Sequence, residues 1–328
     1  MAGDYLYAGF RVDSSIALPP LASTPNLAAQ PELRIERPWP AGRTQALAPE
    51  WLHFWREGDG STTLQVARAP GAGPQSDRRL LRAPGQCDFL IDPDAGTIAV
   101  DGKVGLDVHT LEHLLLDQAL PRLLAARGHL MAHASLVQIG AHCVAFLGRS
   151  GWGKSTLAGL LHRRGFTALC DDCARLDLSA GMVLATPAYP GMRLYADSIA
   201  QAFEDSPDTT PVADYSAKQR VIGLRLLPEQ LAPRPLAALY LLDAPDQGIT
   251  TPTLEPLTRA VSCMALVEHG FRLDPTVASA TAQVLRQASG IADVIPTHRL
   301  RYPRDFDRSD VLLDLLATHF DQLESTRR

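Results

Sequence analysis

The sequence feature that most constrains the fold is the run from Gly148 to Ser155, which reads Gly-Arg-Ser-Gly-Trp-Gly-Lys-Ser. It fits the pattern G-x-x-x-x-G-K-[ST] without a mismatch. Residues 143–147 are apolar and predict a buried strand before it, and residues 154–164 predict a helix after it. Glycines let backbone N–H groups close around phosphate oxygens, so this strand–loop–helix order predicts a phosphate-binding loop.

Each residue of this loop has an expected part in holding a nucleotide. Lys154 would contact the β- and γ-phosphates, and the Ser155 hydroxyl would ligate Mg²⁺. The positive end of the dipole of the following helix would also face the phosphates. The residues expected to contact the nucleotide here are Gly148, Arg149, Ser150, Gly151, Trp152, Gly153, Lys154, Ser155 and Thr156.

An acidic pair, Asp171 and Asp172, follows the next apolar segment, residues 166–170. Successive strand residues point to opposite sides, so one carboxylate could hold Mg²⁺ or its water while the other points toward an acceptor hydroxyl. A carboxylate within hydrogen-bond reach of a serine hydroxyl would serve as the base of phosphoryl transfer. The sequence leaves open which Asp has which role. A single metal-binding Asp beside a bystander is the alternative.

Other chemistry-bearing residues near this motif have simpler interpretations. His133 lies on a predicted strand, residues 129–138, and an isolated histidine is more often a core residue than a catalyst. Cys170 and Cys173 form a Cys-x-x-Cys around the Asp pair, but no second Cys pair completes a zinc site. Five cysteines in 328 residues are not a disulfide framework. We interpret the two cysteines as small apolar residues beside the Asp pair.

Composition excludes several classes of function. A net charge of -5 disfavours nucleic acid as a partner, because the phosphate backbone requires a basic face. The chain begins without a basic and apolar leader, and no run approaches the ~20 apolar residues of a membrane helix. We therefore expect a cytoplasmic protein without a membrane partner.

The chain divides into a β-rich first part and a mixed second part. Turn signals separate short predicted strands before residue 105, and Asp92 to Gly96 predicts a hairpin turn. Helical spacing covers residues 108–126, and residues 204–217 read as an exposed loop. The predicted strands are 5–12, 33–36, 51–55, 62–66, 87–91, 97–100, 236–242 and one within 293–302; the later predicted helices are 197–203, 255–269, 276–288 and 309–323.

Three of these features together resemble the catalytic core of the HPr kinase/phosphorylases. They are the run His133-Ala-Ser-Leu-Val, the glycine-rich loop from Gly148 to Ser155, and the pair Asp171-Asp172. The resemblance implies an α/β fold with a P-loop kinase core of the HPr kinase/phosphoenolpyruvate carboxykinase type. Residues 106–328 would form this catalytic domain and residues 1–105 a β-rich N-terminal domain.

A closer resemblance is to the HPr-kinase-related proteins that accompany biosynthetic gene clusters, including the lasso-peptide tailoring kinases. It rests on three segments: Tyr5-Leu-Tyr-Ala-Gly-Phe-Arg-Val, Tyr189 to Leu194, and Leu300 to Asp307. It implies a serine kinase that uses ATP, or another nucleoside triphosphate, with Mg²⁺. The implied acceptor is a serine on a peptide or protein, in particular a ribosomally made precursor peptide.

The resemblance also implies roles for individual residues. Ser155 and the Asp pair would hold the metal and supply the base, and Lys154 would serve the phosphates. His133 would lie near the transferred phosphate. Lys218 and Arg220 would neutralise charge in the transition state, with Arg193 as a weaker candidate.

The sequence departs from the HPr kinases at two places. Thr156 stands where they usually carry Glu, and their Glu-x-Arg-Gly signature is absent, with residues 185–195 in its place. These departures speak against phosphorylase activity and against HPr as the substrate. A small-molecule hydroxyl kinase and a non-catalytic nucleotide-binding module are the alternatives. The HPr kinases form hexamers, and for this chain a homo-oligomer stays open, as does GTP or pyrophosphate as the donor.

Overall fold

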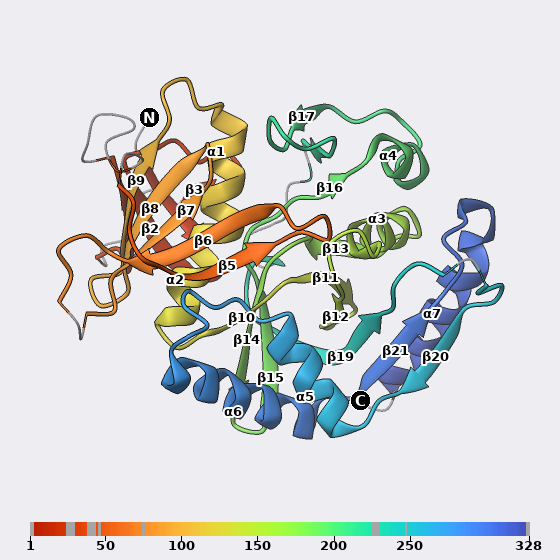
Figure 1. Cartoon of the computed structure of the whole chain (residues 1–328). Coiled ribbons are helices and arrows are strands. Elements are labelled where there is room, and N and C mark those ends of the chain that lie inside the picture. The colour runs from red at the N-terminus through yellow and green to blue at the C-terminus, as the bar shows by residue number, and fades with distance from the viewer. Residues whose placement is uncertain are drawn as a thin grey trace. The chain divides into compact units, whose positions relative to one another are not determined.

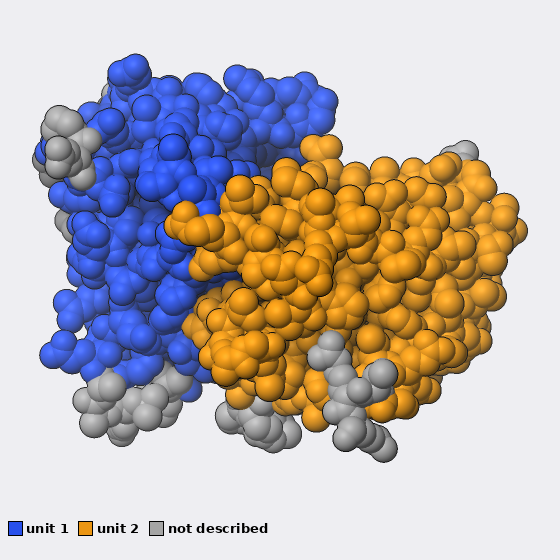
Figure 2. Space-filling model, turned by 90° about the horizontal axis from the view of Figure 1, so that it is seen from below, with its two compact units in different colours: residues 1–131, 211–216, 271–283 blue, residues 132–210, 217–270, 284–328 orange. Residues whose placement is uncertain are grey.

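The computed structural model describes residues 3–23, 30–37, 44, 47–73, 76–222, 224, 230–246 and 248–325 (Figure 1). The chain forms two compact units, which Figure 2 shows in different colours. The first comprises residues 1–131, 211–216 and 271–283, and the second comprises residues 132–210, 217–270 and 284–328. Residues 106–131 thus lie in the first unit. The predicted domain boundary at residue 105 stays a prediction.

The first unit contains a nine-stranded sheet in the order β3-β1-β2-β4-β9-β8-β7-β6-β5. The predicted turn at residues 92–96 is confirmed, because β8 and β9 pair antiparallel on either side of it. The bounds are β1 Gly3–Tyr7, β2 Phe10–Ser14, β3 Ala22–Ser23, β4 Leu33–Glu36, β5 Trp51–Arg56, β6 Thr62–Arg68, β7 Arg79–Ala83, β8 Cys87–Asp92 and β9 Thr97–Gly102.

The prediction of a single strand over residues 5–12 is wrong. The chain turns at Ala8 and Gly9, whose φ angles are 51° and 84°. Two successive positive φ angles form the tight turn that suits the twist of an antiparallel pair. β1 and β2 are therefore the two arms of a hairpin with Tyr7 opposite Phe10.

The predicted helix over residues 108–126 consists of α1 (Val108–Leu114), a π-helical turn (Leu115–Ala119) and α2 (Leu120–Ala126). Asp107 caps α1 by accepting a hydrogen bond from the Thr110 amide at 2.8 Å. In this wide turn the Leu120 amide donates a hydrogen bond to the Leu115 carbonyl. The next carbonyl along the chain receives no such bond, because Pro121 has no N–H. The Tyr7 hydroxyl donates to that carbonyl, on Leu116, at 2.6 Å and so satisfies it.

The main sheet of the second unit has parallel strands at its centre. β12 runs parallel to β19, and β19 runs parallel to β21. Antiparallel strands extend the sheet, with β11 between β12 and β13, and β15 between β19 and β14. The bounds are β11 Ala134–Ile139, β12 His142–Leu147, β13 Thr167–Cys170, β14 Ala174–Ser179, β15 Met182–Pro187, β19 Arg234–Leu242, β20 Thr253–Pro256 and β21 Thr297–Arg301; β10 Leu130–Ala132 lies where the chain passes from the first unit to the second. The mixed α/β class is confirmed.

Helices α3 (Lys154–Arg163) and α7 (Ser309–Ser325) bury apolar side chains against this sheet. Their shared core contains Phe146 and Tyr240 from the strands, Leu157 and Leu161 from α3, and Phe320 from α7. The other elements of the second part of the chain are α4 Ala196–Ala202, α5 Arg259–Glu268, α6 Ala278–Val294, and a small sheet of β16 Arg193–Leu194, β18 Gln219–Val221 and β17 Thr209–Pro211.

Two further predictions need correction. Residues 255–269 were predicted as one helix, but β20 ends at Pro256 and α5 begins after Thr258, whose hydroxyl accepts from the Val261 amide at 3.4 Å. The segment 204–217 is not wholly an exposed loop, because it contains β17 and the buried side chains of Val212 and Ala213. Among the described residues, no helix combines the length and the apolar character that crossing a membrane would need.

Candidate phosphate-binding site

The glycine-rich loop lies between β12 and α3, as the motif predicts. β12 ends at Leu147 and α3 begins at Lys154, with Gly153 as the residue before its first turn. Gly151 and Gly153 have φ angles of 79° and 90°. Residues with a side chain are strained in this conformation, so the loop requires glycine at these two positions. The first N–H groups of a helix have no partner within it, and the first turn of α3, from Lys154 to Thr156, lines the cavity beside the loop.

Two backbone carbonyls of the loop hold the side chain of Lys154 in place. Its Nζ donates to the carbonyl of Gly148 at 2.7 Å and to that of Arg149 at 3.3 Å. The side chain is 5% exposed, and burial lowers its pKa to about 8, against the opposing effect of Asp172 and Asp171. Both acceptors that the described residues place at hydrogen-bond distance from the ammonium group are neutral carbonyls, and an anion would be a stronger partner.

Asp171 is turned into the protein interior. The Ser135 hydroxyl donates to its carbonyl at 2.6 Å and to its Oδ1 at 3.1 Å. The amide of Arg193 donates to its Oδ2 at 2.8 Å, and the Ser155 side chain also bonds to it. Burial and the adjacent charge of Asp172 raise the pKa of Asp171. This carboxylate therefore ties β11, β16 and the start of α3 together.

Asp172 faces the cavity beside the loop. Its Oδ2 lies 2.7 Å from Nη2 of Arg193, and its Oδ1 lies 4.0 Å from Nε2 of His133. Burial by itself would raise the pKa of Asp172, but the charge of Arg193 and the other cations around it lower that pKa below its usual range. The carboxylate is therefore charged at neutral pH.

His133 lies between the Asp pair and the chain that follows α5. Its amide donates to the carbonyl of His269 at 2.8 Å, and its side chain lines the cavity. Burial and the charge of Lys154 lower the pKa of His133, so its ring is neutral at pH 7. Burial and the charges of Lys154 and Arg149 lower the pKa of His269 to about 4. His269 lies in no motif, so the sequence offered no signal for it.

Of the two basic residues that the resemblance implied, only one lies at the cavity. Lys218 lines the cavity, with its Nζ 5.6 Å from the ring centre of Tyr195. Arg220 lies on β18 opposite Arg193 and is not part of the cavity wall. Arg193, the weaker candidate, pairs directly with Asp172.

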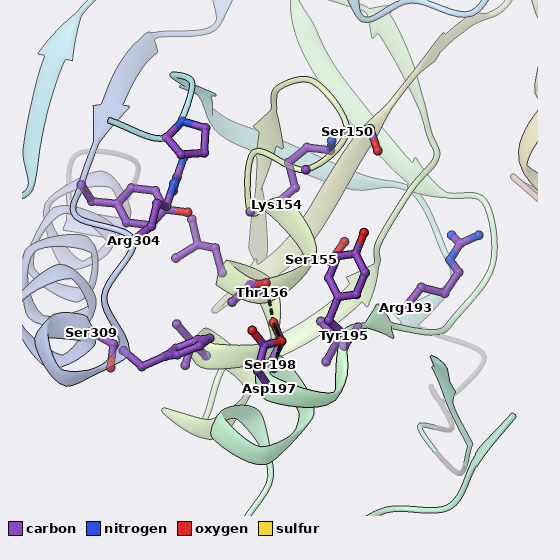
Figure 3. Close-up of a pocket in the computed structure, with 18 of the residues that line it drawn as sticks. Ser150, Lys154, Ser155, Thr156, Arg193, Tyr195, Asp197, Ser198, Arg304 and Ser309 are labelled. Carbon is purple, nitrogen blue, oxygen red and sulfur yellow. Dashed lines mark hydrogen bonds between the residues drawn. The ribbon is translucent and has the colours of Figure 1, made fainter. Parts of the chain in front are cut away.

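The cavity has a volume of about 280 Å³ and a second wall that the sequence analysis missed (Figure 3). Of the predicted site residues, the structure brings His133, Ser150, Gly151, Gly153, Lys154, Ser155, Thr156, Asp172 and Lys218 to it, but not Gly148, Arg149, Trp152, Asp171 or Arg220. The Thr156 hydroxyl lies 2.9 Å from that of Ser198 on α4. The missed wall is formed by Tyr195, Asp197, Ser198, Pro245, Tyr302, Pro303, Arg304, Asp305, Phe306, Ser309 and Leu312.

The residues present suit a metal that arrives with phosphates. Within the described ranges, no group of three His, Cys, Asp or Glu residues could hold an ion by itself. Mg²⁺ is usually held by one or two carboxylates together with substrate phosphates; Ser155 and Asp172 provide oxygens at the cavity, and Asp171 bonds to the Ser155 side chain. Among the described residues, Cys170 and Cys173 are buried thiols rather than halves of a disulfide, and burial raises the pKa of Cys170. These cysteines therefore fit the apolar role predicted for them.

Comparison with known proteins adds little to this geometry. No family model matches the chain, and no curated protein matches it. Among solved structures, the chain is similar to the HPr(Ser) kinase/phosphatase from Coxiella burnetii, with 13% sequence identity and a TM-score of 0.30. The match covers 59% of this chain and 98% of that one. A likeness of this size supports no conclusion about activity, so the function has to be argued from the site itself.

Proposed function

We propose that this chain is a nucleotide-dependent kinase that transfers a γ-phosphoryl group to a serine hydroxyl on a peptide or protein. One observation carries the proposal. A single cavity joins the start of α3, with Lys154 and Ser155, to the carboxylate of Asp172 and the guanidinium of Arg193. Phosphoryl transfer needs this combination of phosphate-binding groups and a carboxylate that orients the acceptor.

The loop and α3 would hold the donor phosphates. The backbone N–H groups of the first helical turn, together with the helix dipole, favour an anion at this end of α3. Lys154 would exchange the carbonyls of Gly148 and Arg149 for a phosphate oxygen. Ser155, to which Asp171 bonds, would hold Mg²⁺ together with the donor phosphates, and the ion when bound neutralises phosphate charge and aligns the phosphates.

Asp172 is the better candidate for the carboxylate that faces the acceptor. Both carboxylate oxygens of Asp171 already accept hydrogen bonds, from Ser135 and from the Arg193 amide. Asp172 lines the cavity, and its lowered pKa makes it a weak base. We therefore propose that Asp172 orients the acceptor hydroxyl. In a loose transition state this orientation matters more than early removal of the hydroxyl proton. Arg193 would neutralise charge on the transferred group.

The acceptor in this proposal is a serine on a peptide or protein, presented from the surface beside the cavity. The cavity of about 280 Å³ is close to the lower end of the roughly 300 to 1,000 Å³ of pockets for drug-sized ligands, and the donor's phosphates would occupy the part beside the loop. A precursor peptide of the lasso type is the first acceptor to test, because the sequence resemblance points to that class.

The test is phosphate transfer by a matched pair of variants. Wild type should hydrolyse MgATP slowly and add one phosphate to a serine of the acceptor peptide, as seen by mass spectrometry. Asp172→Asn should reduce transfer by about 100-fold or more, while MgADP affinity stays within about threefold of wild type. The control is Asp177→Asn, which removes a carboxylate that pairs with Arg175 outside the cavity.

Three outcomes would contradict parts of the proposal. Undiminished transfer by Asp172→Asn would remove the role given to that carboxylate. A wild-type protein that binds MgATP without turnover would be a regulatory module, the non-catalytic alternative. A wild-type protein that does not bind MgADP at all would overturn the proposed function as a whole.

A further inference from the structure

Arg304 is a cation held in a fixed position in the cavity wall. It follows β21, and its guanidinium carbon lies 3.6 Å from the ring centre of Tyr302. Its Nη2 donates to the carbonyl of Asp243 at 2.9 Å. A stacked aromatic ring and one backbone carbonyl therefore determine where the guanidinium points.

The remaining donors of Arg304 are buried and unused. Within the described part of the chain, neither Nε nor Nη1 has a hydrogen-bond partner. The nearby carboxylate of Asp243 lies 2.7 Å from Nε of Arg301 and 3.6 Å from Nε of Arg299. Buried N–H donors without acceptors are costly, so such groups in a cavity wall indicate a missing anionic partner. Burial also lowers the pKa of Arg304 to about 10, which still leaves it charged at neutral pH.

The unused donors lie against the phosphate-binding loop. A Cβ built on Gly153 would be 3.4 Å from Nη1 of Arg304. In Figure 3, Arg304 lies on one side of the cavity and Arg193 on the other, with Lys154 and Ser155 between them. Arg193 and Asp172 form the side where the acceptor would meet the transferred phosphoryl group. Arg304 is therefore on the side where the rest of the donor would remain.

We propose that Arg304 binds a non-bridging oxygen of the donor's diphosphate, the part that stays on the protein after transfer. This inference rests on the proposed function and deepens it by giving the two arginines different roles. Arg304 contributes to the affinity for the diphosphate, and Arg193 contributes to phosphoryl transfer. It follows that removal of the Arg304 side chain lowers the affinity for MgATP, for MgADP and for magnesium pyrophosphate by the same factor.

Calorimetric titration with MgADP and with magnesium pyrophosphate tests this assignment. Arg304→Gln should lower the affinity for both ligands by about 10- to 100-fold, which is the contribution expected of a charge-assisted hydrogen bond. Arg304→Lys should recover part of the affinity, because it restores the charge without the planar fork. The matched control is Arg308→Gln, which removes an equal charge from an exposed arginine paired with Asp305. It should change either affinity by less than about threefold.

The failures of the two proposals can be distinguished. Wild-type affinity in Arg304→Gln, or equal losses in Arg304→Gln and Arg308→Gln, would overturn the assignment of Arg304 while nucleotide binding by wild type stands. Absence of MgADP binding by wild type would overturn the proposed function together with it. Arg304→Gln could weaken the fold, so its unfolding curve is compared with that of Arg304→Lys. If Arg304→Lys is as stable as wild type, an MgADP affinity between those of Arg304→Gln and wild type supports the assignment, and an affinity as low as that of Arg304→Gln overturns it.

Discussion

At the scale of single residues, both backbone conformation and neighbouring side chains restrict which residues the glycine-rich loop can carry. A Cβ on Gly153 would lie 2.8 Å from the hydroxyl of Tyr302, which is buried beneath Arg304. Gly151 has a similar φ angle, but among the described residues no atom lies within 4 Å of a Cβ built on it. Alanine at Gly151 would therefore add backbone strain alone, whereas alanine at Gly153 would add both strain and a steric clash.

We predict that Gly153→Ala weakens MgADP binding more than Gly151→Ala does. Both changes cost about 1–2 kcal/mol of folding free energy, because alanine is strained at these φ angles. Only the change at Gly153 also displaces Tyr302 and Arg304 from the cavity wall. Urea unfolding and MgADP titration measure the two effects, and Tyr302→Phe in the Gly153→Ala background should recover part of the affinity. Equal losses of affinity in the two alanine variants would show that the crowding does not matter.

The parts of the site that could be predicted are those that lie within one stretch of chain. Lys154 and Ser155 belong to a motif whose spacing fixes their place at the start of a helix, and Asp172 follows a strand. Arg304 and His269 could not be found in this way, because only the folded sheet brings residues so distant in sequence to the loop. Which Asp faces the cavity was also undecidable, since it depends on Ser135 and on the Arg193 amide.

At the scale of elements, strands were missed where their turns lack a strong signal. β14 and β15 pair as a hairpin around Ala180 and Gly181, whose φ angles are 50° and 78°. An Ala-Gly pair is a weaker turn signal than the Asn-Gly or Asp-Gly that favours this geometry. The long helical pattern of residues 108–126 was recognised, but its π-helical turn depends on Tyr7 from another element. Local sequence therefore predicted which elements exist better than where they bend.

One contact between β19, β21 and α7 makes the fold sensitive to acid. His298 lies opposite Tyr240 in register, and its ring is 4.6 Å from that of His319. The Tyr240 hydroxyl lies 2.7 Å from Nδ1 of His319. Burial and His319 lower the pKa of His298 to about 4. The unfolded chain therefore takes up this proton first, and its stabilising contribution is complete above pH 6.5 and is lost as the pH falls toward 4.

We predict that wild type loses more unfolding free energy between pH 7 and pH 5 than His298→Asn does. The full difference would be about 2 kcal/mol at 1.36 kcal/mol per pH unit, and partial exposure of His298 reduces it to about 1 kcal/mol. Urea unfolding at the two pH values measures the difference, and data at pH 8 give the baseline cost of the substitution. Parallel pH dependence in the two proteins would exclude His298 as the source.

At the scale of the whole molecule, neither unit is a continuous stretch of chain. The first unit takes in residues 271–283, more than a hundred residues after its main part ends at residue 131. The sequence pattern suggested a boundary at residue 105, because turn signals separate short predicted strands before it. Such a local pattern cannot show a return of the chain, since the returning segment is defined by its contacts. One of these contacts is an ion pair between Arg79 on β7 and Asp274, whose side chains are 8% and 5% exposed.

We predict that Arg79→Met destabilises the fold by about 3–5 kcal/mol, because it leaves the charge of Asp274 buried without its partner. The adjacent Arg78→Met is the matched control, since Arg78 is 52% exposed and pairs with Asp92 at 3.3 Å. Its loss should be at most about 1 kcal/mol. Adding Asp274→Asn to Arg79→Met should recover stability, because the charge is gone while the side-chain oxygen still accepts from the Thr276 amide, 3.0 Å away in wild type. Urea unfolding gives the three free energies. Equal losses in the two arginine variants would mean that this ion pair does not hold the returning segment in the first unit.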